Sequence, residues 1–348
     1  SWRLSRVSES VSISRRDVLR ITAGVGLGAA FGLGVSREAL WRAGLHRVSE
    51  TRVQMGTLVN ITVVHPDNAG AHEMIDSAFL EMERLEAVLS RYRPDSAVGR
   101  LNAAGLLERA PSPLIEVIEL ALEVSRRSSG AFDVTVAPLV ELYGSTFDRQ
   151  GRPPTDREID ETLSYVGHDG LVVTGSTVTL ADRRMAISLD GVAKGFVVDR
   201  VVDQLSAKGA QRVLVDAGGD MASNRSSGRD EAWTIGIQHP RRTEATIGRV
   251  QLIGGGVATS GDYFRSFTPD HRHHDILDPR TGRPAQELSS ASLLASSAMI
   301  ADALSTAALV LGPVDGIDFI DDFQGAEGIL VSKDGSQLLS KGMGKRLG

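Results

Sequence analysis

The segment Leu189-Asp190-Gly191-Val192-Ala193-Lys194-Gly195-Phe196-Val197-Val198-Asp199 says most about how this chain folds and what it binds. It reads as a glycine-rich turn that opens a helix, and backbone amides at a helix start attract phosphate groups. Far downstream, Ala301-Asp302-Ala303-Leu304-Ser305-Thr306 places a carboxylate and a hydroxyl four residues apart, hence on one helix face. Magnesium uses one or two carboxylates and completes its shell with water and phosphate. Together the segments predict a magnesium-assisted pyrophosphate site.

Each segment also has a simpler interpretation. A short glycine-containing turn is a weak signal alone, and the first segment fits a capped helix with an exposed Lys194 equally well. Asp302 and Thr306 could face solvent from the outer side of their helix. They interrupt an otherwise apolar helix, and an unpaired buried carboxylate is costly, so a bound cation is an equally natural solution.

The hydrophobic pattern predicts an α+β fold with layered mixed or antiparallel sheets and packed helices. Strands outnumber helices and several look hairpin-linked, while the regular strand–helix alternation of a doubly wound sheet is absent. A polar stretch, 144–157, reads as a loop that could act as a mobile flap. The predicted strands are 57–64, 171–174, 177–180, 185–189, 212–215, 233–238, 247–253 and 328–331; the predicted helices are 71–89, one capped by Ser112 and stopped by Gly130, 192–205 and 297–311.

Composition limits the class of protein. The 348 residues are 41% hydrophobic, enough for one large domain or two closely packed ones. The net charge is −6, and the first 47 residues carry eight arginines against three acidic residues, so the remainder is strongly acidic. An acidic body without a basic patch argues against nucleic-acid binding. The absence of cysteine excludes disulfides, Cys-ligated zinc and thiol catalysis.

The N-terminal segment resembles a twin-arginine export signal. Ser14-Arg15-Arg16-Asp17-Val18-Leu19-Arg20 precedes an uncharged apolar run that extends from Ile21 to Val35. A core helix is the alternative, but paired arginines before such a run suit a targeting segment better. We therefore expect residues 1–47 to be an export signal with a connector, and 48–348 to be the folded domain. Because of this signal, the protein is expected outside the cytoplasm, in the periplasm or at the cell surface. No clear cleavage site follows the run, so a membrane-anchored form is also expected.

Three further groups of residues are of types that can carry chemistry. Tyr92 lies in a loop after a helix, as do Phe132 and Asp133, and such residues can stack on and hydrogen-bond a flat heterocycle. Core packing of Phe132 and a solvated Tyr92 are the simpler alternatives. A third group, His271, His273 and His274, invites a zinc interpretation, although a solvated histidine-rich loop is favoured because no partner set is evident.

These segments, in this order, resemble the ApbE family of flavin transferases, whose members use FAD to attach FMN to a protein threonine. The similarity covers about eight blocks, including 55–57, 90–102, 129–135, 190–199, 218–220, 259–263, 278–282 and 301–312. The resemblance implies an FAD site lined by Met55, Tyr92, Ala131, Phe132, Asp133, Asp190 and Phe196, with Ile276 nearby. It also implies metal ligation by the backbone carbonyl of Ala193 together with Asp302 and Thr306.

One departure from the family concerns the proton acceptor. The family usually has histidine three positions before the first Asp of the Asp-Pro-Arg-Thr-Gly turn, whereas this chain has Asp275 there and His274 one residue earlier. Either side chain is a candidate catalytic residue. The expected reaction is magnesium-dependent transfer of FMN from FAD to a threonine of an acceptor flavoprotein, with release of AMP. Hydrolysis of FAD to FMN and AMP, or non-catalytic FAD binding in assembly, are the alternatives.

Overall fold

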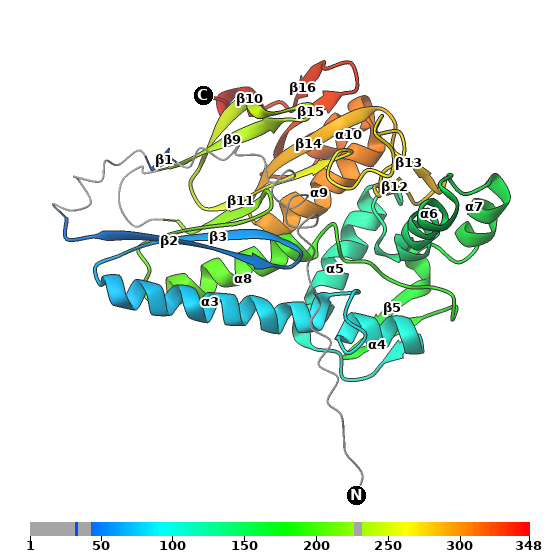
Figure 1. Cartoon of the computed structure of the whole chain (residues 1–348), viewed down its shortest axis with the longest axis horizontal. Coiled ribbons are helices and arrows are strands. Elements are labelled where there is room, and N and C mark those ends of the chain that lie inside the picture. The colour runs from blue at the N-terminus through cyan, green and yellow to red at the C-terminus, as the bar shows by residue number, and fades with distance from the viewer. Residues whose placement is uncertain (1–31, 34–42, 226–231) are drawn as a thin grey trace, which may run out of the picture.

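An eight-stranded antiparallel sheet forms the centre of the protein (Figure 1). The structure is a computed structural model, and it describes residues 32–33, 43–225 and 232–348. Strands lie in the order β16-β15-β14-β11-β8-β7-β3-β2, and every neighbouring pair is antiparallel. Their bounds are β2 His46–Gln54, β3 Thr57–His65, β7 Arg212–Ala217, β8 Asp220–Ser223, β11 Gly255–Gly261, β14 Leu288–Ala295, β15 Glu327–Ser332 and β16 Gln337–Leu339.

The sheet is covered on both faces, which is why its strands are rich in apolar residues on both sides. Alternate residues of β7 belong to different clusters: Val213 and Val215 pack with the helices, and Leu214 packs with Trp233 and Ile235. The helical layer consists of α3 Asn68–Leu89, α8 Ala193–Ala207, α9 Ala298–Leu311 and α10 Pro313–Asp321. The other face carries a small antiparallel sheet of β9 Trp233–His239 and β10 Arg242–Leu252 (Figure 1). The short strand β1 Gly32–Leu33 pairs with β9 on the side away from β10.

A smaller region extends from the helical layer, at the right of Figure 1. Helix α5 packs against α3 and α9 and links this region to the main body. Its elements are α4 Ala97–Ala104, β4 Leu106–Leu107, α5 Ser112–Arg127, α6 Ala137–Gln150, α7 Asp156–Leu163, β5 Leu171–Thr174 and β6 Thr177–Leu180. The short hairpin of β12 Leu277–Asp278 and β13 Arg283–Pro284 packs near it, where Leu277 joins a cluster with residues of α6 and α7.

The predicted α+β class is confirmed, and three local predictions are wrong. Residues 185–189 form no strand: Ile187 instead bonds the Asn102 side chain through both its amide (2.8 Å) and its carbonyl (2.9 Å). The segment 144–157 is mostly helix, because α6 continues to Gln150 and Thr155 caps α7 through a capping box with Glu158. Ser112 is the first residue of α5, and no side chain caps that helix.

The predicted export signal lies outside the described residues, apart from the two residues of β1. Among the helices in the described ranges, none is both long and apolar enough to cross a lipid bilayer.

The close packing of α8 on α9 depends on a glycine. A Cβ added at Gly195 would lie 2.3 Å from the carbonyl oxygen of Ala298 and 2.7 Å from the Cα of Met299. Because both are backbone atoms, they cannot move aside without separating the helices. We expect Gly195→Ala to lower the free energy of unfolding by about 3 kcal/mol, measured by urea denaturation.

Gly144→Ala is the matched control for this substitution. Gly144 lies within α6, and an added Cβ there would meet no atom within 4 Å. Alanine should therefore stabilise the protein by about 0.5 kcal/mol, because it favours the helix. Equal stability of the two variants would contradict the tight α8–α9 contact.

Candidate active site

The turn that precedes α8 meets the middle of α9. The Gly195 amide donates a hydrogen bond to Asp302 Oδ2 (3.1 Å), which fixes the carboxylate beside the first turn of α8. Thr306, one helical turn further along α9, lies against Gly191, where an added Cβ would be 2.9 Å from the threonine hydroxyl oxygen. Asp302 and Thr306 therefore both face the turn that contains Ala193, the first residue of α8.

A third element adds hydroxyl oxygens to this place. Ser260, near the end of β11, lies 2.8 Å from Ser305 Oγ and 2.9 Å from Thr306 Oγ1. Carboxylate, hydroxyl and carbonyl oxygens are the donors that magnesium prefers, and one or two carboxylates are enough when phosphates complete the shell. The residues at this junction thus fit a magnesium ion.

The charge balance around Asp302 also suits a cation. The Asp302 side chain is 4% exposed, and burial followed by the negative charge of Asp220 raises its pKa well above the usual range. Lys194 and the Gly195 amide act in the opposite direction. Lys194 is ion-paired to Asp220, so the charge of one ammonium group is shared between two buried carboxylates, Asp220 and Asp302. The junction therefore holds an excess of negative charge that a divalent ion would offset.

Asp190 is bound by side chains rather than serving as a helix cap. Its Oδ2 accepts hydrogen bonds from Arg91 Nε (2.9 Å) and from the Tyr92 hydroxyl (2.9 Å). The Arg91 side chain is only 8% exposed, and its guanidinium lies over the Tyr92 ring, 4.3 Å from the centroid. This arrangement joins the end of α3 to the turn before α8, 99 residues away.

Asp275 lies on the same side of the site. Arg265 contacts it, with Nε 3.5 Å from Asp275 Oδ2, and also donates to the Tyr92 hydroxyl (2.7 Å). Burial raises the pKa of Asp275 to about 6, opposed by the charge of Arg265 and reinforced by that of Asp190. A carboxylate with this pKa is ionised at neutral pH and basic enough to accept a proton.

His274 has different surroundings. Its side chain is fully buried, and Nε2 is 2.8 Å from the carbonyl oxygen of Ala285. Burial lowers the pKa of this imidazole to about 4, so it is neutral at physiological pH. Of the two candidate proton acceptors, only Asp275 adjoins the Arg265–Tyr92–Asp190 group.

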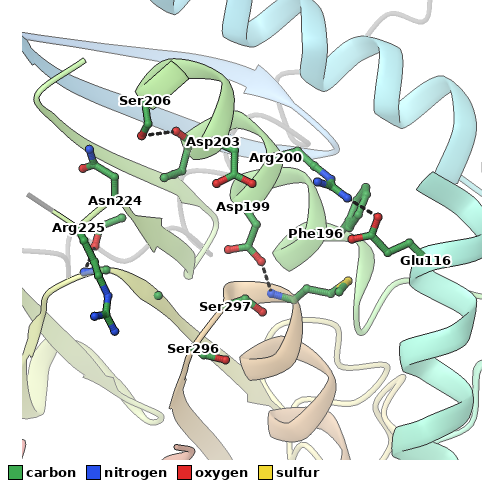
Figure 2. Close-up of a pocket in the computed structure, with 15 residues that line it drawn as sticks. Glu116, Phe196, Asp199, Arg200, Asp203, Ser206, Asn224, Arg225, Ser296 and Ser297 are labelled. Atoms are coloured by element: carbon green, nitrogen blue, oxygen red, sulfur yellow. Dashed lines mark hydrogen bonds and ion pairs between the residues drawn. The ribbon is translucent and has the colours of Figure 1, made fainter. Parts of the chain in front are cut away.

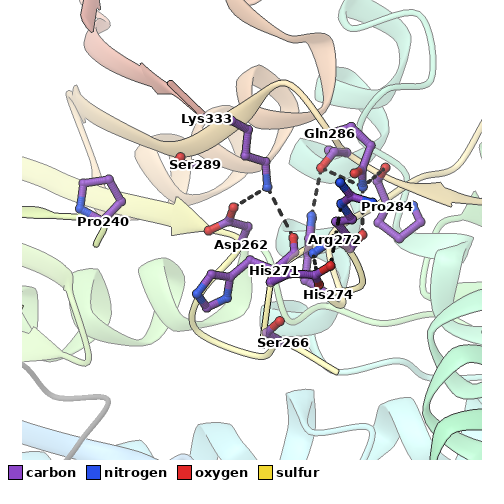
Figure 3. Close-up of polar contacts among 12 residues, drawn as sticks. Pro240, Asp262, Ser266, His271, Arg272, His274, Pro284, Gln286, Ser289 and Lys333 are labelled. Carbon is purple, nitrogen blue, oxygen red and sulfur yellow. Dashed lines mark hydrogen bonds and ion pairs between the residues drawn. The ribbon is translucent and has the colours of Figure 1, made fainter. Parts of the chain in front are cut away.

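Asp262 anchors the start of the loop that carries Arg265 and Asp275. It is fully buried and accepts two hydrogen bonds from Arg241 (2.7 Å each) and one from Lys333. Figure 3 shows Lys333 between Asp262 and His271, whose carbonyl oxygen it also bonds (3.3 Å). On the far side of the loop, Gln286 binds the carbonyl of Arg272 (2.8 Å). These contacts hold the loop backbone at both ends.

The remaining residues of the predicted FAD site are spread around this centre. The Phe132 ring lies against Gly191, 3.4 Å from the position of an added Cβ. Ala131 is buried next to it, and the Asp133 carboxylate is used internally, accepting from the amides of Thr135 (2.8 Å) and His168 (2.6 Å). Ile276 packs against the core beside Asp275, and Met55 occupies the turn between β2 and β3 with a φ of 51°.

Phe196 is buried in the core and also borders a separate cavity of about 580 Å³ (Figure 2). This cavity follows α8 beyond its first turn. Asp199 lies there and accepts hydrogen bonds from the amides of Ala298 (2.9 Å) and Met299 (2.8 Å), which caps the start of α9. The cap fixes the position of α9, and with it Asp302 and Thr306.

The three histidines do not assemble a metal site. Within the part of the chain that the structure describes, no group of three or more His, Cys, Asp or Glu side chains is arranged to hold a metal ion. The proposed magnesium ligands are not such a group, because only one of them is a carboxylate.

Sequence reasoning missed Arg91 and Arg265. Arg91 lies within the similar segment 90–102 but has no role assigned from the sequence, Arg265 lies outside every similar segment, and both act through contacts with residues distant in sequence. Asp220 was noted only within a similar segment, yet it is the partner of Lys194.

Comparisons with known proteins identify the family of this chain. Residues 55–330 match the profile of the ApbE family. Two proteins named FAD:protein FMN transferase are similar: that of Vibrio cholerae serotype O1 is 31% identical over 272 residues, covering 76% of this chain and 81% of the relative. That of Salmonella typhimurium is 33% identical over 270 residues, covering 74% and 77%.

Solved structures give the same result. The ApbE protein of Thermotoga maritima superposes with a TM-score of 0.78 at 30% identity, covering 86% of this chain and 99% of its own. The apo form of the flavinyl transferase ApbE from Pseudomonas stutzeri has a TM-score of 0.75 at 28% identity, covering 87% and 98%. The chain therefore belongs to the ApbE family.

Proposed function

We propose that this protein transfers FMN from FAD to a threonine side chain of an acceptor flavoprotein and releases AMP, in a magnesium-dependent reaction. The relatives named FAD:protein FMN transferase support the reaction class. The observation that carries the proposal for this chain is the junction of the turn before α8 with Asp302 and Thr306 of α9.

Asp302, Thr306 and the carbonyl of Ala193 would hold the magnesium ion. When bound there, it supplies positive charge at the diphosphate of FAD. Gly191 lets the turn lie close to α9, because a Cβ there would be 2.9 Å from the Thr306 hydroxyl oxygen. The exposed ring of Tyr92 offers a flat surface to a ring system of FAD, whereas Phe132 is buried and packs in the core.

In the transfer step, the threonine oxygen of the acceptor forms a bond to the phosphorus of the FMN half. The bond from this phosphorus to the bridging oxygen breaks, and AMP leaves with that oxygen and its electron pair. The hydroxyl proton passes to Asp275. We assign this role to Asp275 rather than His274, because the histidine is buried and bonded to Ala285.

We also propose that the protein works outside the cytoplasm, exported through the twin-arginine signal and associated with the membrane where that segment is retained. The sequence of residues 14–35 supports this proposal. Fractionation of cells that express the full chain, compared with an Arg15→Lys/Arg16→Lys variant, tests it. Recovery of both proteins in the same cytoplasmic fraction would contradict it.

The reaction is tested by mixing the purified chain with FAD, MgCl₂ and a candidate flavoprotein that has been expressed and purified separately. We expect the acceptor to gain the mass of one FMN, with one AMP released for each flavin attached, and we expect EDTA to stop both. Free FMN and AMP without a mass gain would indicate hydrolysis, in which water takes the place of the threonine. FAD that stays intact for hours would indicate a binding protein and contradict the proposal.

A further inference from the structure

Arg265 occupies a central position among the charged groups of the site. Its Nε is 3.5 Å from Asp275 Oδ2, its Nη1 donates to the Tyr92 hydroxyl (2.7 Å), and the same Nη1 is 3.9 Å from Asp190 Oδ2. Arg265 and Asp275 are also joined through the backbone, because the Asp275 amide donates a hydrogen bond to the Arg265 carbonyl oxygen (3.1 Å). Arg265 thus contacts both the proposed proton acceptor and two residues proposed to line the FAD site.

We infer that Arg265 is the positioning residue of Asp275: its guanidinium, which also contacts Tyr92 and Asp190, fixes where the carboxylate lies. The inference rests on the proposed function, since it assigns Arg265 a part in the same transfer step. Arg265 is not itself placed in contact with the reacting atoms.

A carboxylate at position 275 needs a neighbouring cation, because its basic form is negatively charged, whereas the basic form of an imidazole is neutral. Asp275 is 19% exposed, and an ionised carboxylate in such a place is stable only when it is paired. Asp190 acts on it with a second negative charge, and the other cation that acts on it, Arg91, is bound to Asp190. The charged groups that act on Asp275 are therefore Arg265, Asp190 and Arg91, and Arg265 alone contacts it directly among the described residues.

The loop backbone fixes where the guanidinium can reach. Just after Arg265, Phe267 stacks on Phe147 of α6, with ring centroids 5.2 Å apart, and its amide bonds the carbonyl of His273 (2.7 Å). Just before it, Asp262 is fixed by Arg241 and Lys333. Arg265 is thus held between two anchored points, which favours a directed contact over a freely moving surface side chain.

Arg265→Gln tests the inference by changing the titration of Asp275. Arg265 lowers the pKa of Asp275, so its removal should raise that pKa by about one unit. The ionised base is required for transfer, so activity is lost as the pH falls through this pKa. The acid limb of kcat/KM should therefore move to higher pH by about one unit, with an approximately tenfold loss at pH 5.5 and a loss below twofold at pH 9.

Two further variants separate charge from structure. Arg265→Lys keeps the cation and should return the acid limb most of the way to its original pH. Arg272→Gln is the matched control, because Arg272 lies on the same loop with a side chain that is 77% exposed and paired only to Asp270 among the residues described. It should leave the profile unchanged. A uniform loss of activity at every pH in Arg265→Gln would indicate a merely structural role and overturn the inference.

A direct readout keeps the test independent of turnover. Carboxyl ¹³C NMR of the full chain, with the Asp275 signal assigned by its absence in Asp275→Asn, gives the pKa of Asp275 with and without Arg265. An unchanged pKa would overturn the inference even if the enzyme transfers FMN. A shifted pKa in a protein that transfers no FMN would instead show that the proposed function is wrong while the Arg265–Asp275 contact is real.

Discussion

Replacing Asp302 by asparagine is expected to lower the rate of magnesium-dependent AMP release from FAD by on the order of 1000-fold. Asparagine keeps the shape of the side chain and an oxygen near the Gly195 amide, but it removes the negative charge that would hold the ion. The measurement is AMP release by chromatography at saturating FAD over a range of MgCl₂ concentrations. Turnover close to that of the unmodified protein would remove the metal assignment.

The same variant should not be less stable in the absence of metal. Burial raises the pKa of Asp302, so the folded state is penalised when the carboxylate ionises, and this penalty grows as the pH rises above the unfolded pKa. Asp302→Asn removes it, and its Tm at pH 8 should equal or exceed that of the unmodified protein. MgCl₂ with FAD should raise the Tm of the unmodified protein but not of the variant. Asp203→Asn, at an exposed position of α8, is the control.

Asp275→Asn is expected to lower kcat by on the order of 100-fold, because asparagine cannot accept the threonine proton. The unmodified protein should show an acid limb near pH 6, where Asp275 titrates, and this limb should disappear in the variant. Asp275→His restores a base and should regain most of the activity. Steady-state kinetics between pH 5 and 9 give all three results.

His274 provides the contrast to Asp275. His274→Gln should lower stability by about 1–3 kcal/mol, because it disturbs a buried bond to the Ala285 carbonyl. It should leave kcat/KM within a few-fold at a temperature where the variant is folded. A 100-fold loss of kcat in the folded His274 variant, with little effect of Asp275→Asn, would show that the proton acceptor has been assigned to the wrong residue.

Local patterns were sufficient for the parts of the site that lie within one element. The spacing of Asp302 and Thr306 needs only an α-helix to place both on one face, and α9 provides it. The glycines before α8 needed only a turn. One prediction failed because of a partner elsewhere: 185–189 alternates like a strand, but Asn102 takes the backbone bonds that a neighbouring strand would supply.

The arginines and the choice of proton acceptor could not be predicted for the same reason. Arg91 reaches Asp190 across 99 residues, and Arg265 reaches Tyr92 across 173, so neither contact leaves a local pattern. The choice between His274 and Asp275 depends on which side of the chain faces the core. His274 is buried and lies against the Ala285 carbonyl, whereas Asp275 contacts Arg265, and no local pattern shows either partner.

A crystal structure of the full chain with MnCl₂ and FAD tests the central claim most directly, because manganese replaces magnesium and gives an anomalous signal. We predict an anomalous peak between the Asp302 carboxylate, the Thr306 hydroxyl and the Ala193 carbonyl, with oxygens of the FAD diphosphate completing its shell. FAD bound with its diphosphate away from α8, and no peak beside Asp302, would contradict the account.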